Sequence, residues 1–157
     1  MIEIIRECTV DAPPEAVWSV VSAPERSAEW FSFADRVEVL DGTGVGQRQR
    51  QYGRWGKRAA EIDRELVEYD PPRAYAWRHV AERLDGRPAP RFAASTRFDI
   101  TLEPAGDGTR IRLRSRQEPA SLARGLVMRA FGAAEVRRHM DRTLDRLAAL
   151  FRDSLAR

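Results

Sequence analysis

The chain has 157 residues, with 27 basic and 24 acidic side chains and a net charge of +3, and this length favours one domain over two. Hydrophobic residues make up 43%, which excludes a disordered chain, and no apolar run approaches the roughly 20 residues that cross a bilayer. Cys8 is the only cysteine, which excludes an internal disulfide and favours a reducing cytoplasm. We expect one domain over residues 1–157, with no secretory signal and no membrane insertion.

The first predicted elements are one strand and two short helices. Residues 2–10 form a strand, and Asp11-Ala12-Pro13-Pro14 ends it and starts a helix, because proline suits the first helical turn. Apolar residues recur at helical spacing over residues 14–22. Ala23-Pro24 then ends this helix and starts a shorter one that continues to about Trp30.

Six further strands are predicted between residues 36 and 118. They are RVEVLDG, GQRQRQY, and residues 59–69, 73–83, 91–103 and 109–117. The last two form a hairpin whose register follows from its own residues. Pairing Glu103 with Arg110 gives one face of opposed acids and arginines and one apolar face, with Leu102 opposite Ile111. A slip of one residue would exchange the two faces, so the register is well specified.

A long helix is predicted from Pro119 to the end of the chain. Its apolar stripe contains large residues in the C-terminal half, including Leu147 and Phe151, which predicts tight packing against the sheet there. Its N-terminal part carries Gly125 and Gly132, and the opposing strand positions are Phe92, Ala94, Thr96, Ser115 and Gln117. Small and polar residues fill space poorly, so we expect an apolar pocket with a few polar groups at this end.

Three segments resemble the polyketide cyclase/dehydrase and lipid-transport family of the START-like, birch-pollen-allergen-like superfamily. They are VDAPPEAVWSVVSAPERSAEW (10–30), VEYDPPRAYAW (67–77) and RFDITLEPAGDGTRIRLR (97–114). The resemblance implies an α+β helix-grip fold, in which a seven-stranded antiparallel sheet wraps around the C-terminal helix and encloses a hydrophobic ligand cavity. Because members include cyclases, lipid carriers and ligand sensors, it implies no fixed catalytic set.

The predicted cavity residues occupy positions that should face the N-terminal part of the long helix, where we expect the pocket. Alternation along the strands directs Arg6 inward, as it does Tyr75, Trp77 and His79. A buried Arg6 requires a partner, either a ligand anion or an acid such as Glu118, and Arg64 raises the same question. The predicted lining residues are Arg6, Trp30, Tyr75, Trp77, His79, Phe92, Thr96, Phe98, Ser115, Met128, Phe131, Val136, His139 and Met140.

The candidate chemistry of these residues is limited. His79 and His139 are the only histidines, and each is either an acid–base group or a hydrogen-bonded wall residue. Two histidines make a poor metal site, and the absence of a Walker loop, G-x-G-x-x-G and H-E-x-x-H gives no support for a cofactor, so we expect neither.

Three functions remain open, with the protein a monomer or a homodimer. The leading hypothesis is binding of a small hydrophobic, lipid-like or aromatic molecule. The alternative is a polyketide cyclase or dehydratase that uses His79, Tyr75 and Arg6. The third is a nucleic-acid module built on GQRQRQYGRWGKR (46–58), but we interpret this run as a strand and loop at the pocket rim, offset by the acidic residues at 61, 63, 65 and 68, and expect no nucleic acid.

Overall fold

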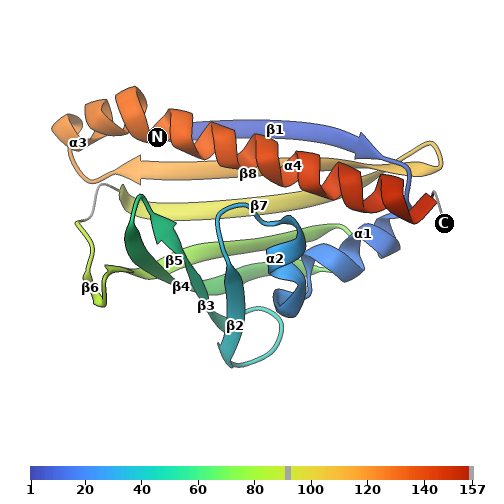
Figure 1. The fold of residues 1–157 in the computed structure, drawn as a ribbon, viewed down its shortest axis with the longest axis horizontal. Helices are drawn as coiled ribbons and strands as arrows, with labels where there is room; N and C mark the ends of the chain where they lie inside the picture. The colour runs from blue at the N-terminus through green and yellow to red at the C-terminus, as the bar shows by residue number, and fades with distance from the viewer. Residues whose placement is uncertain (91–92, 156–157) are drawn as a thin grey trace.

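Seven long strands form one antiparallel sheet in the computed structural model, which describes residues 1–90 and 93–155 (Figure 1). The spatial order is β1-β8-β7-β5-β4-β3-β2, and a short additional strand, β6, pairs with β5. The strands are β1 (Ile2–Val10), β2 (Arg36–Asp41), β3 (Arg48–Trp55), β4 (Arg58–Asp70), β5 (Ala74–Leu84), β6 (Arg87–Pro88), β7 (Ala93–Ala105) and β8 (Gly108–Pro119).

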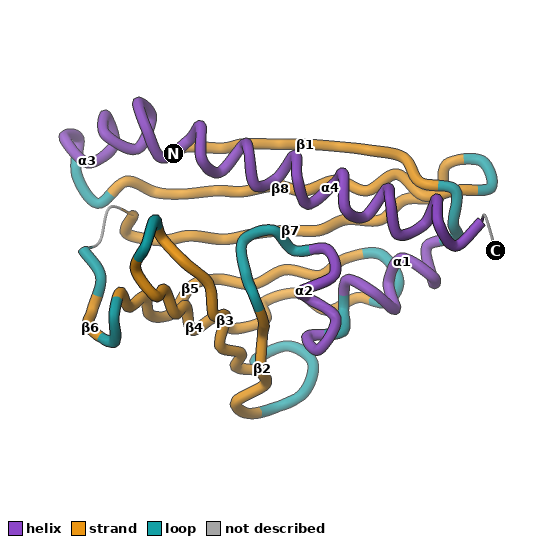
Figure 2. Tube along the Cα trace, viewed as in Figure 1, coloured by secondary structure: helices purple, strands orange, loops and turns teal. Residues whose placement is uncertain are grey.

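The helices lie on one side of this sheet. Figure 1 shows a long helix that runs along the sheet beside β1, and Figure 2 shows the two short helices that follow β1 in the chain near the C-terminal half of this helix. No helix in the described part of the chain is both long and apolar enough to cross a membrane. The helices are α1 (Pro14–Val21), a 3₁₀ turn η1 (Pro24–Arg26), α2 (Ser27–Trp30), α3 (Leu122–Val127), a π-helical segment η2 (Met128–Gly132) and α4 (Ala133–Leu155).

The predicted α+β helix-grip architecture is therefore confirmed, including the register of the β7–β8 hairpin. Glu103 pairs with Arg110 and Leu102 with Ile111. On the polar face, the Arg116 side chain reaches Asp99 at 2.9 Å, and arginines of β8 also pair with acids of β1. The alternation of apolar and charged residues fixes this register because a slip would bury the charged row.

The tight packing between the C-terminal half of α4 and the sheet, here called the closed half of the grip, also lies where the sequence predicts it. Leu147 is fully buried and Phe151 is nearly so, and both belong to one core with Val10 and Val17. Leu102 and Ile111 extend the same core from the sheet. Large side chains therefore close the space between the C-terminal half of α4 and the sheet.

Three local features differ from the prediction. The loop expected at Gly86-Arg87-Pro88 contains the short strand β6, and the C-terminal helix includes the π-helical segment η2. A β-bulge lies between Ala93 and Ser95, where two steps along β7 match one step along β8. The extra residue shifts the side-chain alternation, so Ala93 lines the cavity while Ala94 is exposed. The predicted inward orientation of Ala94 is therefore wrong.

Candidate functional site

A cavity of about 510 Å³ lies between the sheet and the N-terminal part of the long helix. Its walls come from β3, β4, β5, β7 and β8, from η2 and α4, and from the segment after α2. The structure places nine of the predicted residues in this lining. They are Trp77, His79, Thr96, Phe98, Ser115, Met128, Phe131, Val136 and His139.

Aromatic rings form one wall of the cavity. The rings of Trp77 and Phe98 stack with centroids 5.0 Å apart, and Phe31 meets Trp77 edge-on at 5.5 Å. Phe33 packs against Phe98 and also against the ring of His139. Because each ring is held by others, this wall is a rigid apolar surface of the kind that binds flat or chain-like hydrophobic molecules.

A hydrogen-bonded histidine lies in the helix wall. The Nδ1 atom of His139 is 2.7 Å from the Ser32 hydroxyl, and its Nε2 atom is 3.1 Å from a carboxylate oxygen of Glu135. Burial lowers the pKa of His139, and the bond from Arg138 lowers the pKa of Glu135. A neutral imidazole beside an ionised Glu135 carries its proton on Nε2, which leaves Nδ1 to accept a hydrogen bond from Ser32.

A second histidine lies on the sheet side of the cavity. The Nδ1 atom of His79 is 2.9 Å from a carboxylate oxygen of Glu82, and both residues line the cavity. Thr96 and Ser115 add buried hydroxyl groups. The cavity therefore combines an apolar wall with a few polar groups capable of hydrogen bonding.

Arg64 lies one layer behind the cavity wall and is almost fully buried. Its Nε atom donates to Gln49 at 2.9 Å, one terminal nitrogen donates to Gln51 at 3.2 Å, and its Cζ atom lies 3.9 Å from the ring centroid of Trp77. Among the described residues it forms no ion pair. Burial lowers the pKa of Arg64 to about 10, so the guanidinium remains charged at neutral pH. This charge favours an acidic or electron-rich ligand oxygen at this end of the cavity.

Two polar residues of the predicted site lie outside the cavity lining. Arg6 does point toward the helix side, but β1 is an edge strand, and there the Arg6 side chain bonds to Asp141 of α4 at 3.1 Å and stays partly exposed. Its partner is thus neither a ligand nor Glu118. Tyr75 is buried, and its hydroxyl accepts a hydrogen bond from Gln49 at 3.0 Å, because the closed half of the core surrounds it.

Two apolar residues of the predicted site also belong to the core instead. Trp30 is buried at the end of α2, and Met140 of α4 is fully buried. The expectation that both line the pocket is wrong, because at these positions the helices and the sheet pack directly against each other and leave no open space. Phe92 lies outside the described residues.

The sequence analysis missed several lining residues. Phe33 follows Ser32 in the segment after α2, and Gln51 and Ile62 come from β3 and β4. Alternation along GQRQRQY was a signal for Gln51, since Gln49 and Gln51 are the buried positions of that strand. Phe33 carried no periodic signal, because it lies in an irregular connection whose path only the packed structure defines.

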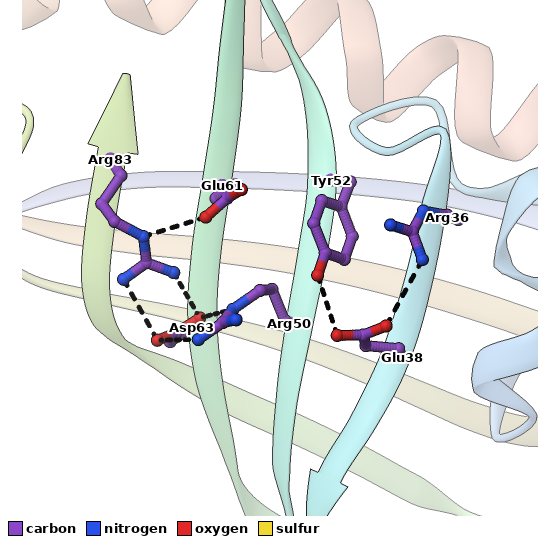
Figure 3. Close-up of polar contacts among 7 residues, drawn as sticks. All are labelled: Arg36, Glu38, Arg50, Tyr52, Glu61, Asp63 and Arg83. Carbon is purple, nitrogen blue, oxygen red and sulfur yellow. Dashed lines mark hydrogen bonds and ion pairs between the residues drawn. The ribbon is translucent and has the colours of Figure 1, made fainter. Parts of the chain in front are cut away.

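The basic run 46–58 lies partly at the cavity rim, as predicted. Figure 3 shows the face of the sheet opposite the helix, where Arg50 contacts Asp63 at 2.7 Å and Arg83 contacts both Asp63 and Glu61. Hydrogen bonds from Arg50, and then from Arg83, lower the pKa of Asp63 to about 2. The acids of β4 therefore neutralise much of this run, as the sequence pattern indicates.

Comparison with known proteins identifies the family. The profile described as polyketide cyclase/dehydrase and lipid transport matches residues 1–152. The chain belongs to this family. No curated protein sequence matches the chain.

Several solved structures share the fold of this chain at low sequence identity. An aromatase/cyclase, Zhui from Streptomyces sp. R1128, is 18% identical with a TM-score of 0.77, and the alignment covers 98% of this chain and 95% of that one. TTHA0849 from Thermus thermophilus is 18% identical with a TM-score of 0.76, covering 98% and 99%. Ara h 8.0201 is 12% identical with a TM-score of 0.71, covering 97% and 98%. These similarities support the helix-grip fold.

Proposed function

We propose that this family member binds a small, largely apolar molecule in the cavity between the sheet and the long helix. The observation that carries the proposal is the cavity itself, about 510 Å³ in volume, with the stacked rings of Trp77 and Phe98 on one wall and few polar groups. Burial of apolar ligand surface supplies roughly 25 cal/mol per Å². The hydroxyls of Thr96 and Ser115, with the charge of Arg64 behind the wall, orient a polar end of the ligand.

Displacement of a fluorescent lipophile, with native mass spectrometry, tests this proposal. Ser115 lines the cavity from β8, so Ser115→Phe places a ring in the space that the ligand occupies. We expect probe binding at least tenfold weaker, equivalent to about 1.4 kcal/mol, with circular dichroism unchanged. Ser95→Phe is the matched control, since Ser95 is exposed outside the lining. If Ser115→Phe misfolds, Val136→Phe repeats the test from the helix wall.

The proposal fails if the wild-type protein binds no lipophile, or if both phenylalanine variants of the lining bind the probe as tightly as the wild type. Equal weakening by Ser95→Phe also counts against it, because a surface site would then hold the probe. If circular dichroism shows that Ser95→Phe disturbs the folded structure, Ser95→Leu replaces it as the control.

The two histidine–glutamate pairs favour a second candidate, a cyclase or dehydratase acting on a polyketide-like substrate. His139 is neutral, oriented on both ring nitrogens and placed in the cavity wall, as an acid–base group requires. This candidate predicts that His139→Ala and His79→Ala each abolish turnover while the protein stays folded. Full turnover in both variants eliminates it. Ser95→Ala, outside the cavity, controls for unspecific loss.

A further inference from the structure

The cavity opens where lining residues are also exposed to solvent. Trp55, at the end of β3, is 59% exposed and lines the cavity, and Phe131 of η2 is 74% exposed and lines it from the other side. Figure 1 shows the β3–β4 turn and the α3 end of the long helix at the same end of the molecule. These two segments form the rim of the cavity mouth.

The helical part of the rim has its apolar side chains on the outside. From Ser121 to Phe131 only Gly125 and Met128 are buried, while Leu122 is 92% exposed and Leu126 is 70% exposed. Scattered single hydrophobic residues are normal on a surface, but a cluster on one short segment marks an interaction site. A second hollow of about 560 Å³, lined in part by Leu122 and Leu126, continues this apolar surface beside α3.

The turn part of the rim presents a tryptophan at its tip. Trp55 pairs with Arg58 across a two-residue turn, and Gly56 enters this turn with a positive φ of 62°. Such a tight turn ends the hairpin immediately beyond Trp55 and leaves its indole in solvent. The tip therefore offers an amphipathic ring beside the mouth.

Basic residues accompany both apolar parts of the rim. Residues 54–58 contain three basic residues and no acid, and residues 119–134 contain two arginines and no acid. Arg58 pairs with Asp85, but Arg54, Lys57 and Arg129 form no ion pair among the described residues. The rim thus combines exposed apolar side chains with cations that the rest of the protein leaves unneutralised.

We propose that the mouth rim docks on the surface of an anionic lipid bilayer. Trp55, Leu122, Leu126 and Phe131 would enter the boundary between headgroups and acyl chains, while the cations contact anionic headgroups. The contact is peripheral, confined to the boundary between headgroups and acyl chains. A second copy of this chain is a poorer occupant, because a two-fold pairing of this surface would bring Arg54, Lys57 and Arg129 together with their own counterparts.

Docking in this orientation places the cavity mouth against the acyl chains. A hydrophobic molecule then moves between bilayer and cavity without crossing water. This consequence rests on the proposed ligand binding, whereas the docking itself does not. Vesicle binding therefore tests the docking and probe displacement tests the ligand binding, and a negative result in one assay does not decide the other.

Cosedimentation of the full chain with vesicles tests the docking. The two preparations are equimolar phosphatidylcholine and phosphatidylserine, and phosphatidylcholine alone. We expect binding to the anionic vesicles that weakens as salt is raised, and much weaker binding to the neutral ones. One basic residue near an anionic surface strengthens binding about fivefold, the equivalent of about 1 kcal/mol.

Variants separate the apolar and the charged contributions. Leu122→Ser/Leu126→Ser removes exposed side chains that do not line the ligand cavity, and Lys57→Glu/Arg129→Glu reverses two free charges. We expect each pair to weaken binding to anionic vesicles by about tenfold or more. The matched controls are Val45→Ser, an exposed residue of the β2–β3 loop, and Arg152→Glu, an exposed residue near the end of α4, and both should bind as the wild type does.

Four results would overturn the proposal. The first is no sedimentation with anionic vesicles, and the second is equal loss in the control variants. The third is loss in the charge-reversal pair with none in the serine pair, because Leu122 and Leu126 then do not enter the bilayer and the vesicles are held by charge alone. The fourth is a concentration-dependent dimer that the serine pair abolishes, because a second copy then covers the rim. Losses in both rim pairs with unchanged probe displacement support docking.

Discussion

The buried guanidinium of Arg64 allows a sharp test of what this group contributes to stability. The fall of its pKa from 12.5 to about 10 means that burial of the charge costs about 3 kcal/mol. Arg64→Met relieves that cost. It also removes the cation from the face of Trp77, worth about 1 kcal/mol, and leaves the amide oxygens of Gln49 and Gln51 without their donor, at about 2 kcal/mol each. We expect a net loss of about 2 kcal/mol.

Replacing the glutamines as well should reverse this loss. In Arg64→Met/Gln49→Leu/Gln51→Leu the two amide oxygens that Arg64 served are gone. The remaining penalties are about 1 kcal/mol each for the hydrogen bonds that the Tyr75 hydroxyl and the part-buried Gln47 amide oxygen lose. The triple variant should therefore be about 2 kcal/mol more stable than the single variant, although two further core residues are changed.

Urea unfolding of the three proteins, followed by circular dichroism, measures these differences. A triple variant less stable than Arg64→Met would refute the reasoning, because core substitutions without such compensation each cost about 1 kcal/mol. If the expected order is found, the protein retains a buried cation that does not stabilise its fold. Its retention is then explained by the proposed ligand site, where the charge lies behind Trp77 and Gln51.

Three further predictions concern stability. Leu147→Ala should lower the free energy of unfolding by about 2–5 kcal/mol, because Leu147 is fully buried in the closed half of the grip, and a loss below about 1 kcal/mol in urea unfolding would contradict this packing. Gly108→Ala should destabilise the protein strongly, because the new Cβ would lie 2.3 Å from the Val10 carbonyl oxygen. A Cβ at Gly132 meets nothing within 4 Å, so Gly132→Ala should leave the protein as stable as the wild type. Similar melting temperatures for the two variants would contradict this geometry. The pKa of Asp63 is about 2, below its ordinary 3.8, so its contribution is fully present above that ordinary value and is lost as pH falls toward 2. Asp63→Asn should remove this acid-dependent loss, and an unchanged pH profile of urea unfolding would contradict it.

The sequence by itself determined the architecture and the closed half of the grip. Alternation fixed the register of β7 and β8, because a one-residue slip exchanges the two faces of a strand. The large residues Leu147 and Phe151 on the helix stripe located the tight contact, because side-chain size and helical period are both local properties.

Only the tertiary structure decided which inward-facing residues reach the cavity. Arg6 has the predicted orientation, yet it pairs with Asp141 because β1 is the edge strand beside α4. Phe33 joins the wall from an irregular connection, and the bulge near Ala93 changes which residue of β7 faces inward. The physical reason is that periodicity specifies the face of each element, whereas the contacts across a cavity depend on sheet curvature, bulges and the path of the connections.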